Sequence, residues 1–541
     1  MVRTLTQSTM RRQADDDPWR EMKPPTATAR RAAFAVAGTL VLTLAALAPT
    51  VAGAAEDDGG LAGSDLWLNP YSTTLEAAQS LSGQARADAQ LLGSIPSANW
   101  ITKGTPAEAQ AAVDAIVDAA SARHEMPVIV AYNLPYRDCA QYSAGGAANT
   151  ADYEAWIDGV AAGIAGREAT VILEPDGLGI IPFYTPPGAA MEWCQPADIA
   201  DPASAATARF EQLNYAVDAL KKGAGTSVYL DGTHSGWLGV GDISNRLITA
   251  GVERADGFFL NASNYVATER LQKYGTWISQ CIDLSQRSWW EPGWCASQYY
   301  PATPGDFSTW GLSDAAYAQA YADTGLTADP ETMVHFVLDT SRNGQGPWTA
   351  PSGAYPDPEE WCNPPGRGAG ALPTTEVADP LIDAYLWIKV PGESDGQCYR
   401  GTGGPLDPAR GMKDPAAGQW FVEQARELIA NSNPPLAPLD CNVTLTGTKT
   451  GKGFVMGLGV QNNSGESVTP WTLSWTYRGD QVVDSVAGGS STQIGADVSV
   501  VSSRPDTTAG NGKNPTLTVK TTGAAAVPWL FYLNGKACTS G

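Results

Sequence analysis

The sequence predicts an α/β domain built on seven or eight parallel strands, followed by a smaller all-β domain. Three observations support this prediction. Short apolar runs alternate with Ala-rich helical stretches between residues 64 and 433. Polar residues follow nearly every apolar run, and in parallel α/β folds that end of the sheet carries the active site. Beyond Pro438, short alternating strands separated by Gly, Asn and Ser turns replace this pattern.

The apolar runs are the predicted strands of the first domain. They cover residues 64–71, 98–102, 127–135, 169–176, 227–232, 257–265, 335–343 and 384–392. Helical patterns lie between them at 106–123, 151–166 and 206–223. One run ends in Glu174-Pro175-Asp176. Because a proline cannot donate to a strand ladder, this strand ends there and places Asp176 at its carboxyl end.

The beginning of the chain predicts export. Two arginines precede an uncharged run over residues 32–55, which ends in small residues. We interpret residues 1–55 as a signal peptide and residues 56–63 as an acidic, Gly-rich lead-in. The alternative is a membrane anchor, since the run is long enough to span a bilayer. We expect a secreted, extracellular protein that has no membrane contact after signal cleavage.

Composition narrows the class of partner. The net charge is −23 with only 34 Lys and Arg, which argues against a nucleic-acid partner. The 18 tryptophans suit the apolar faces of neutral sugars, although Trp is as common in protein cores. Eight cysteines without a CxxC pair, with only three histidines, favour disulfides over a zinc site. We expect no metal and no cofactor.

The last hundred residues predict a β-sandwich. It covers residues 441–541 and follows a short Pro-containing linker at 434–440. Cys441 and Cys538 stand at its two ends, as expected of a bridge that ties the termini together. The linker lacks the long Pro/Thr/Ser spacer that lets such domains range freely.

Carboxylates at strand ends are the candidate reactive groups. No nucleophile elbow, Cys–His pairing or phosphate loop is found, which favours acid–base chemistry, of which glycoside hydrolysis is the commonest form. Crowded carboxylates raise one another's pKa, so that one can stay protonated near neutral pH. Each alone is also explained as a helix cap or an ion-pair partner. The candidates are Asp138, Asp176, Asp231, Asp339, Glu393 and Asp395.

Seven motifs of the first domain are specific when taken together and in order. They are AYNLPYRDCAQYSAGG (131–146), VILEPDGLGII (171–181), LDGTHSGWLG (230–239), LNASNY (260–265), LDTSRNGQGP (338–347), WCNPPGRG (361–368) and LWIKVPGESDG (386–396). Over residues 64–433 the chain resembles glycoside hydrolase family 6, cellulases that cleave β-1,4-glucan with inversion. The resemblance implies a distorted barrel and a cellulase. The loops near 182–205 and 396–420 are moderate in length, which favours cleavage of internal bonds, and the predicted signal peptide favours a secreted enzyme. The alternatives are a cellobiohydrolase acting on chain ends, a glucanase for mixed-linkage glucan or xylan, and a non-catalytic glucan-binding protein.

The resemblance implies a role for individual residues. Asp176 matches the general acid, and Asp138 the aspartate that raises the pKa of that acid and engages the water network. Tyr132 matches the tyrosine that crowds the distorted sugar. Asp395 matches the carboxylate proposed as base, while activation of water through a relay is the other mechanism considered for the family. Residues implied to support the centre or bind sugar are Trp100, Asp231, Trp237, Asn264, Trp361, Lys389 and Glu393.

Two positions depart from the family pattern, whereas the positions of the cysteines agree with it. Ala144 stands where a second serine often holds water, and Val240 where some members carry another Trp. The bridges implied by the resemblance are Cys139–Cys194 and Cys362–Cys398. We also expect Cys281 to bond to Cys295, across a Trp-rich insertion that could lengthen the substrate cleft or shield the barrel.

The C-terminal unit resembles a family 2 carbohydrate-binding module through Cys441, PWTLSWTY (470–477) and LNGKAC (533–538). Such modules bind cellulose through a row of exposed tryptophans. This unit has only Trp471 and Trp475, which we expect in its core, and Trp529. Where the family places exposed Trp, the chain has residues 451–453, 487–489 and 503–505, none of them aromatic. Cellulose binding by this unit therefore stays open. We expect a monomer that binds cellulose or another β-1,4-glucan.

Overall fold

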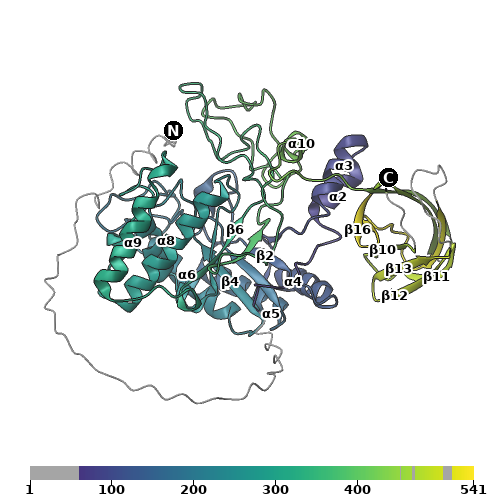
Figure 1. The fold of residues 1–541 in the computed structure, drawn as a ribbon, viewed down its shortest axis with the longest axis horizontal. Coiled ribbons are helices and arrows are strands. Elements are labelled where there is room, and N and C mark those ends of the chain that lie inside the picture. Colours follow the sequence, from purple (N-terminus) through teal and green to yellow (C-terminus); the bar gives the residue numbers. More distant parts are fainter. Residues whose placement is uncertain (1–59, 451–452, 466–469, 504–514) are drawn as a thin grey trace, which may run out of the picture.

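The computed structural model describes residues 60–541 except 451–452, 466–469 and 504–514 (Figure 1). The predicted signal peptide and residues 56–59 of the predicted lead-in fall outside the described residues. Within the described part, no helix combines the length and the apolar character that crossing a membrane requires.

Seven parallel strands form the sheet of the first domain, in chain order. They are β1 (Asn99–Ile101), β2 (Val128–Ala131), β3 (Ala169–Leu173), β4 (Thr226–Asp231), β5 (Gly257–Leu260), β6 (His335–Asp339) and β7 (Ile382–Leu386). The run predicted at 64–71 makes only an isolated bridge, Leu66 with Met126. At the two edges, Ala98 N donates to Trp387 O at 2.9 Å. Trp100 Nε1 of β1 also donates to Ile388 O, just after β7, at 2.8 Å. The sheet is thus a distorted barrel whose two edges are joined by few hydrogen bonds, which confirms the predicted fold class.

Side chains alternate between the inside of this barrel and its helical cover, because the period of a strand is two. One buried cluster lies inside and includes Val130, Ile172, Tyr229, Phe259 and Val337. A larger cluster joins the strands to the helices and includes Ile129, Val171, Val228, Phe258 and Phe336. The strands are therefore buried on both faces, as the continuous apolar runs indicate.

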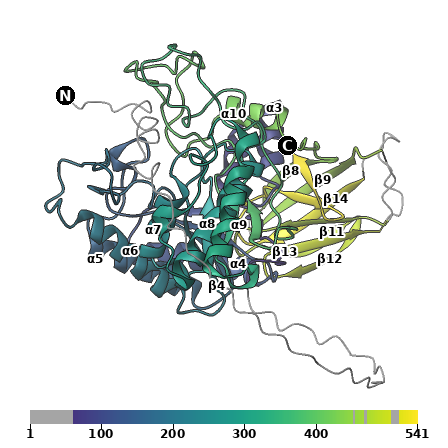
Figure 2. The same cartoon turned by 60° about the vertical axis from the view of Figure 1, so that its left-hand side comes forward.

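Helices cover the outer face of the sheet (Figures 1 and 2). They are α4 (Pro106–Ser121), α5 (Thr150–Ile164), α6 (Ala205–Leu220), α7 (Val240–Thr249), α8 (Thr268–Arg287) and α9 (Gly311–Thr324). The helices α2 (Thr73–Ser80), α3 (Gly83–Leu92) and α10 (Val422–Ala430) lie on the side of the C-terminal domain (Figure 1). A capping box at Thr105 and Glu108, with Pro106 in the first turn, fixes the start of α4.

The C-terminal domain is all-β. Its strands are β8 (Cys441–Thr450), β9 (Gly453–Asn462), β10 (Thr472–Thr476), β11 (Val482–Ala487), β12 (Gly489–Ile494), β13 (Asp497–Ser502), β14 (Thr516–Thr522), β15 (Phe531–Leu533) and β16 (Lys536–Ser540). Their order is β11-β14-β9-β8-β16-β15-β10-β13-β12. Trp471 and Trp475 are buried in the core, as predicted. The structure also contains all the predicted disulfides, Cys139–Cys194, Cys281–Cys295, Cys362–Cys398 and Cys441–Cys538.

Candidate active site

The backbone turns sharply where the central strands end. Left-handed backbone in non-glycine residues costs of order 1–3 kcal/mol each, and it persists where the surrounding structure enforces it, often at active sites. Here it occurs after β2, β3, β4 and β5, at Asp138 (φ 56°), Glu174 (57°), Asp176 (62°), Thr233 (56°) and Asn261 (72°). This concentration at one end of the sheet marks the candidate active site.

Asp176 follows β3 and lies among other carboxylates. Burial raises its pKa well above the ordinary value, and the charges of Asp231, Asp138 and Asp395 raise it further. The residue is nevertheless partly exposed, and no hydrogen bond to its carboxyl is found among the described residues. The geometry therefore provides a carboxyl that keeps its proton at a pH where an ordinary aspartate is ionised.

Asp138 opens the short 3₁₀ helix η2 (Asp138–Ala140), after β2. Its Oδ2 accepts a hydrogen bond from Ser143 N at 2.8 Å. Burial raises its pKa to about 6, against the opposing effects of the Ser143 N–H and the Arg137 charge. Tyr132 lies close enough to both aspartates that their charges add to burial in raising the pKa of its hydroxyl. The structure thus brings Tyr132, Asp138 and Asp176 together.

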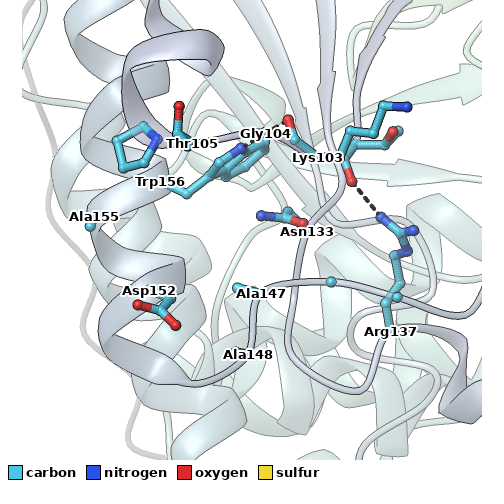
Figure 3. Close-up of a pocket in the computed structure, with 14 residues that line it drawn as sticks. Lys103, Gly104, Thr105, Asn133, Arg137, Ala147, Ala148, Asp152, Ala155 and Trp156 are labelled. Atoms are coloured by element: carbon cyan, nitrogen blue, oxygen red, sulfur yellow. Dashed lines mark hydrogen bonds between the residues drawn. The ribbon is translucent and has the colours of Figure 1, made fainter.

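The loop that carries Asp138 is fixed by an arginine and a glycine beside a pocket of about 510 Å³ (Figure 3). Arg137 Nη1 donates to Thr102 O at 2.9 Å (Figure 3). Its Nε donates to Ser143 O at 2.9 Å. Gly146 has a φ of 101°, and a Cβ there would lie 1.9 Å from a backbone oxygen. The returning loop therefore requires glycine at this position.

Asp395 follows β7 and is held as an ion. Its Oδ2 accepts hydrogen bonds from Arg342 Nη1 at 2.9 Å, Tyr265 Oη at 3.1 Å and Asn363 N at 3.0 Å. Lys389 Nζ lies 3.6 Å from its Oδ1. Burial by itself raises the pKa of Asp395, but the charges of Arg342 and Lys389 outweigh burial and hold the pKa below its ordinary value. Asp176 and Asp395 are therefore driven to opposite protonation states.

The residues that hold Asp395 were missed in the sequence. Arg342, Tyr265 and Asn363 all lie in the quoted motifs. Arg342 and Tyr265 follow β6 and β5, and this position after a strand was the signal that could have found them. Asn363 lies before β7, where only the motif WCNPPGRG marks it. Glu174 was also given no role. It is fully buried, and its carboxyl accepts hydrogen bonds from Asn133 N at 2.9 Å and Leu134 N at 3.1 Å. Glu174 thus ties the end of β3 to the end of β2.

Two of the candidate aspartates, Asp231 and Asp339, accept hydrogen bonds from backbone N–H groups. Asp231 accepts from Thr233 N at 2.9 Å and from Gly179 N at 3.3 Å, and burial raises its pKa to about 6. Asp339 is completely buried and accepts from Ser341 N at 2.9 Å, and from several other backbone N–H groups. Asp231 acts on the site through its charge, whereas Asp339 holds loops together.

Residues 61–432 match the family model described as "Glycosyl hydrolases family 6". The chain belongs to this family. Residues 441–538 match the model described as "Cellulose binding domain". The family 6 domain therefore contains all four of the clustered aspartates.

Several curated proteins and solved structures are similar to this chain. Endoglucanase A of Thermobispora bispora is 29% identical over 509 residues, covering 88% of this chain and 90% of that protein. The probable 1,4-β-D-glucan cellobiohydrolase C of Neosartorya fischeri is 28% identical over 405 residues, covering 69% and 78%. The solved structure of the endoglucanase Cel6 from Mycobacterium tuberculosis has 34% identity and a TM-score of 0.49, covering 69% of this chain and 98% of that one.

Three tryptophans of the family 6 domain are half-buried near these aspartates. Trp100 Nε1 donates to a backbone oxygen at 2.8 Å, and its ring meets the ring of Tyr132 edge-on at 5.5 Å. Trp361 lies 5.7 Å from the Tyr142 ring. Trp237 lies against Gly179, where a Cβ would come within 2.4 Å of the indole. Each indole is fixed by a partner and keeps part of its surface exposed, as a platform for a sugar ring requires.

The Trp-rich insertion of the family 6 domain supports the loop that carries Trp237. Tyr299 Oη donates to Trp237 O at 3.0 Å, and Gln298 Nε2 donates to Leu238 O at 2.8 Å. Trp290 is buried in the cluster that joins sheet and helices. Of the two interpretations given above, these contacts favour an insertion that shields the barrel.

The remaining predicted sugar-binding residues lie on loops at the same end of the sheet. Lys389 Nζ donates to Ser394 O at 3.3 Å, and burial lowers the pKa of this lysine. Glu393 Oε1 accepts a hydrogen bond from Thr73 Oγ1 at 2.6 Å. Asn264 lies in the turn after β5, where its Nδ2 donates to a backbone oxygen at 3.2 Å. Lys389 and Glu393 share a loop with Asp395, whereas Asn264 approaches from the neighbouring turn.

Proposed function

We propose that this chain is a secreted cellulase that hydrolyses internal β-1,4-glucosidic bonds with inversion, with Asp176 as the general acid. The observation that carries the proposal is the raised pKa of Asp176, a partly exposed carboxyl among Asp231, Asp138 and Asp395. The predicted signal peptide and the disulfides support secretion. The names of the similar endoglucanases support cleavage within a glucan, and the match to the model described as "Cellulose binding domain" supports cellulose as that glucan.

In this proposal the proton of Asp176 passes to the glycosidic oxygen as the bond from that oxygen to C1 breaks. The positive charge that develops on the sugar ring needs a stable anion nearby. Asp395 supplies it, because Arg342 and Lys389 keep it ionised. The same lowered pKa, together with three hydrogen bonds to one oxygen, makes Asp395 a weak base.

Asp138 is the better proton acceptor for the attacking water. Its pKa of about 6 lies near neutral pH, where a general base works best. Water attacks C1 from the face opposite the leaving oxygen, so the anomeric configuration inverts. One proton leaves the water for Asp138 while another leaves Asp176, and exchange with solvent resets both groups. Ala144 offers no hydroxyl to this path, which leaves the transfer to Asp138 and water.

Cellobiohydrolase action is the second candidate, favoured by the similar cellobiohydrolase of Neosartorya fischeri. The difference between the two activities depends on whether loops roof the site. The loops at 182–205 and 396–420 are moderate in length, which supports cleavage within the chain rather than at its ends.

The test follows the viscosity and the reducing ends of carboxymethylcellulose together, for wild type and for Asp176→Ala. We expect an early fall in viscosity with wild type and a rate at least about a hundredfold lower with Asp176→Ala, the low end for a lost general acid. Asp484→Ala, on an exposed strand of the C-terminal domain, is the control and should match wild type. An increase in reducing ends without a fall in viscosity would show cleavage from chain ends. β-Anomers as the first products, detected by NMR, would contradict inversion.

A further inference from the structure

The aromatic residues of the C-terminal domain are either in its core or next to the family 6 domain. Residues 441–541 contain seven of them, and five are buried in the core. The other two, Trp529 and Tyr532, are half-buried. Trp529 contacts Tyr71 of the family 6 domain, and charged groups of that domain act on Tyr532. Neither residue therefore belongs to a free aromatic surface.

The first contact between the two domains centres on Tyr71. Its ring meets the Trp529 ring at 5.0 Å and 66°, and its Oη donates to Thr476 O at 2.6 Å. The Arg478 guanidinium lies over both rings, 5.6 Å from the centre of Tyr71 and 5.1 Å from the centre of Trp529. A hydrogen bond, a ring pair and a cation therefore hold Tyr71 from three directions.

A second contact lies at the end of α4. Arg123 donates to Thr476 Oγ1 at 2.6 Å and forms an ion pair with Asp497. Burial raises the pKa of Tyr532 to about 12, and the charges acting on it include Arg123 and Glu125. Tyr532 is half-buried, and charged groups of the family 6 domain act on it.

A third contact joins α3 to β16 (Figure 1). Gln90 Nε2 donates to Ser540 O at 2.9 Å, and Ser540 N donates to Gln90 Oε1 at 3.0 Å. Gln90 is fully enclosed, so these bonds are made away from water. The linker also packs against the family 6 domain, because Leu436 contacts the apolar cluster that contains Leu92 and Trp387. Three separate contacts and a packed linker fix the orientation of the C-terminal domain.

The first contact continues into the candidate active site. Tyr71 lies in a five-residue segment from Asn69 to Thr73, in which Asn69 Oδ1 accepts a hydrogen bond from Tyr71 N at 2.9 Å. Two residues after Tyr71, the Thr73 hydroxyl donates to Glu393 Oε1 at 2.6 Å. Glu393 shares its loop with Asp395. The segment that the C-terminal domain holds is therefore the segment that orients a carboxylate at the site.

We propose that the C-terminal domain is a docked part of the catalytic unit, which positions Glu393 for the glucan chain through the segment from Tyr71 to Thr73. This inference rests on the proposed function in one respect, the binding of glucan by Glu393. Thr73 and Tyr71 are positioning residues, since they act on the substrate through Glu393.

The test uses the full chain and separates docking from positioning. A triple variant, Gln90→Ala, Arg123→Ala and Trp529→Ala, removes one side chain from each contact. Thr73→Val removes only the bond to Glu393, and Thr73→Ser keeps the hydroxyl. Ile494→Ala is the control, because Ile494 lies on β12 and is 79% exposed. Small-angle X-ray scattering measures the compactness of each protein, and near-ultraviolet circular dichroism checks that both domains stay folded.

We expect the triple variant to expand and Thr73→Val to stay as compact as wild type. Both should raise KM for cellohexaose by about 2- to 10-fold, the range of one net hydrogen bond, and keep kcat within about twofold. Adding Thr73→Val to the triple variant should raise KM no further, and Thr73→Ser should restore the wild-type KM.

Three results would each overturn the proposal. The first is a triple variant as compact as wild type, and the second is an expanded triple variant with an unchanged KM. The third is an unchanged KM in Thr73→Val. If wild type hydrolyses no glucan, the proposed function fails by itself. Calorimetric titration of cellohexaose then replaces KM with Kd, and the scattering comparison still decides whether the domain is docked.

Discussion

Replacing Arg342 by methionine removes the nearest cation of Asp395 and keeps an apolar stem of similar length. Arg342 is fully buried, its Nη1 lies 2.9 Å from Asp395 Oδ2, and its guanidinium lies 4.4 Å from the centre of the Tyr265 ring. Removing one partner of a buried ion pair costs about 3–5 kcal/mol, because the other charge stays buried. Since Lys389 Nζ remains 3.6 Å away, we expect the low end, about 3 kcal/mol.

The sign of the pH dependence follows from the lowered pKa of Asp395. A carboxyl whose folded pKa is lowered contributes stability above its unfolded pKa, and this contribution is lost as pH falls through the folded pKa. Without Arg342 the pKa of Asp395 rises, and protonation then relieves the unpaired charge. The stability lost in Arg342→Met should therefore be larger at pH 7 than at pH 4.

Urea unfolding followed by tryptophan fluorescence at both pH values measures this loss. Asp395→Asn combined with Arg342→Met should cost less than the sum of the single changes, because the two residues are directly coupled. The acid limb of the pH profile of kcat/KM should also move to higher pH. Arg400→Met, which breaks the buried pair with Asp407, is the control that destabilises without moving this limb. An equal loss at both pH values, or additive changes, would refute the reasoning.

The remaining predictions concern the general acid, a sugar platform and a bridge. Asp138→Asn removes a charge that raises the pKa of Asp176, so the basic limb of residual kcat/KM should move to lower pH; an unmoved limb would contradict the coupling. Gly179→Ala places a Cβ 2.4 Å from the Trp237 indole, so it should lower kcat/KM on cellohexaose, yet cause no further loss when combined with Trp237→Ala. Cys281→Ser opens a loop with a sequence separation of 14 and should cost up to about 3 kcal/mol of stability, measured by thermal unfolding, with kcat preserved.

Local patterns in the chain predicted most of the elements. Strands β1 to β7 follow the apolar runs because a strand buried on both faces must be apolar throughout. The run at 64–71 has the same composition but forms only the bridge from Leu66 to Met126. Composition shows that a run can be buried, but whether it joins a ladder depends on which neighbours the fold brings beside it.

The sequence by itself determined the two-domain order, the parallel sheet and the rim of acids, which follow from periodicity and motif. The pairs Cys139–Cys194 and Cys362–Cys398 were implied by the resemblance to the family, and the structure contains them. Only the tertiary structure decided the charge of each acid, because the pKa of Asp176 and that of Asp395 depend on burial and on distant partners such as Arg342. It also decided that Tyr71 joins the second domain to the site, since that contact brings together residues hundreds of positions apart.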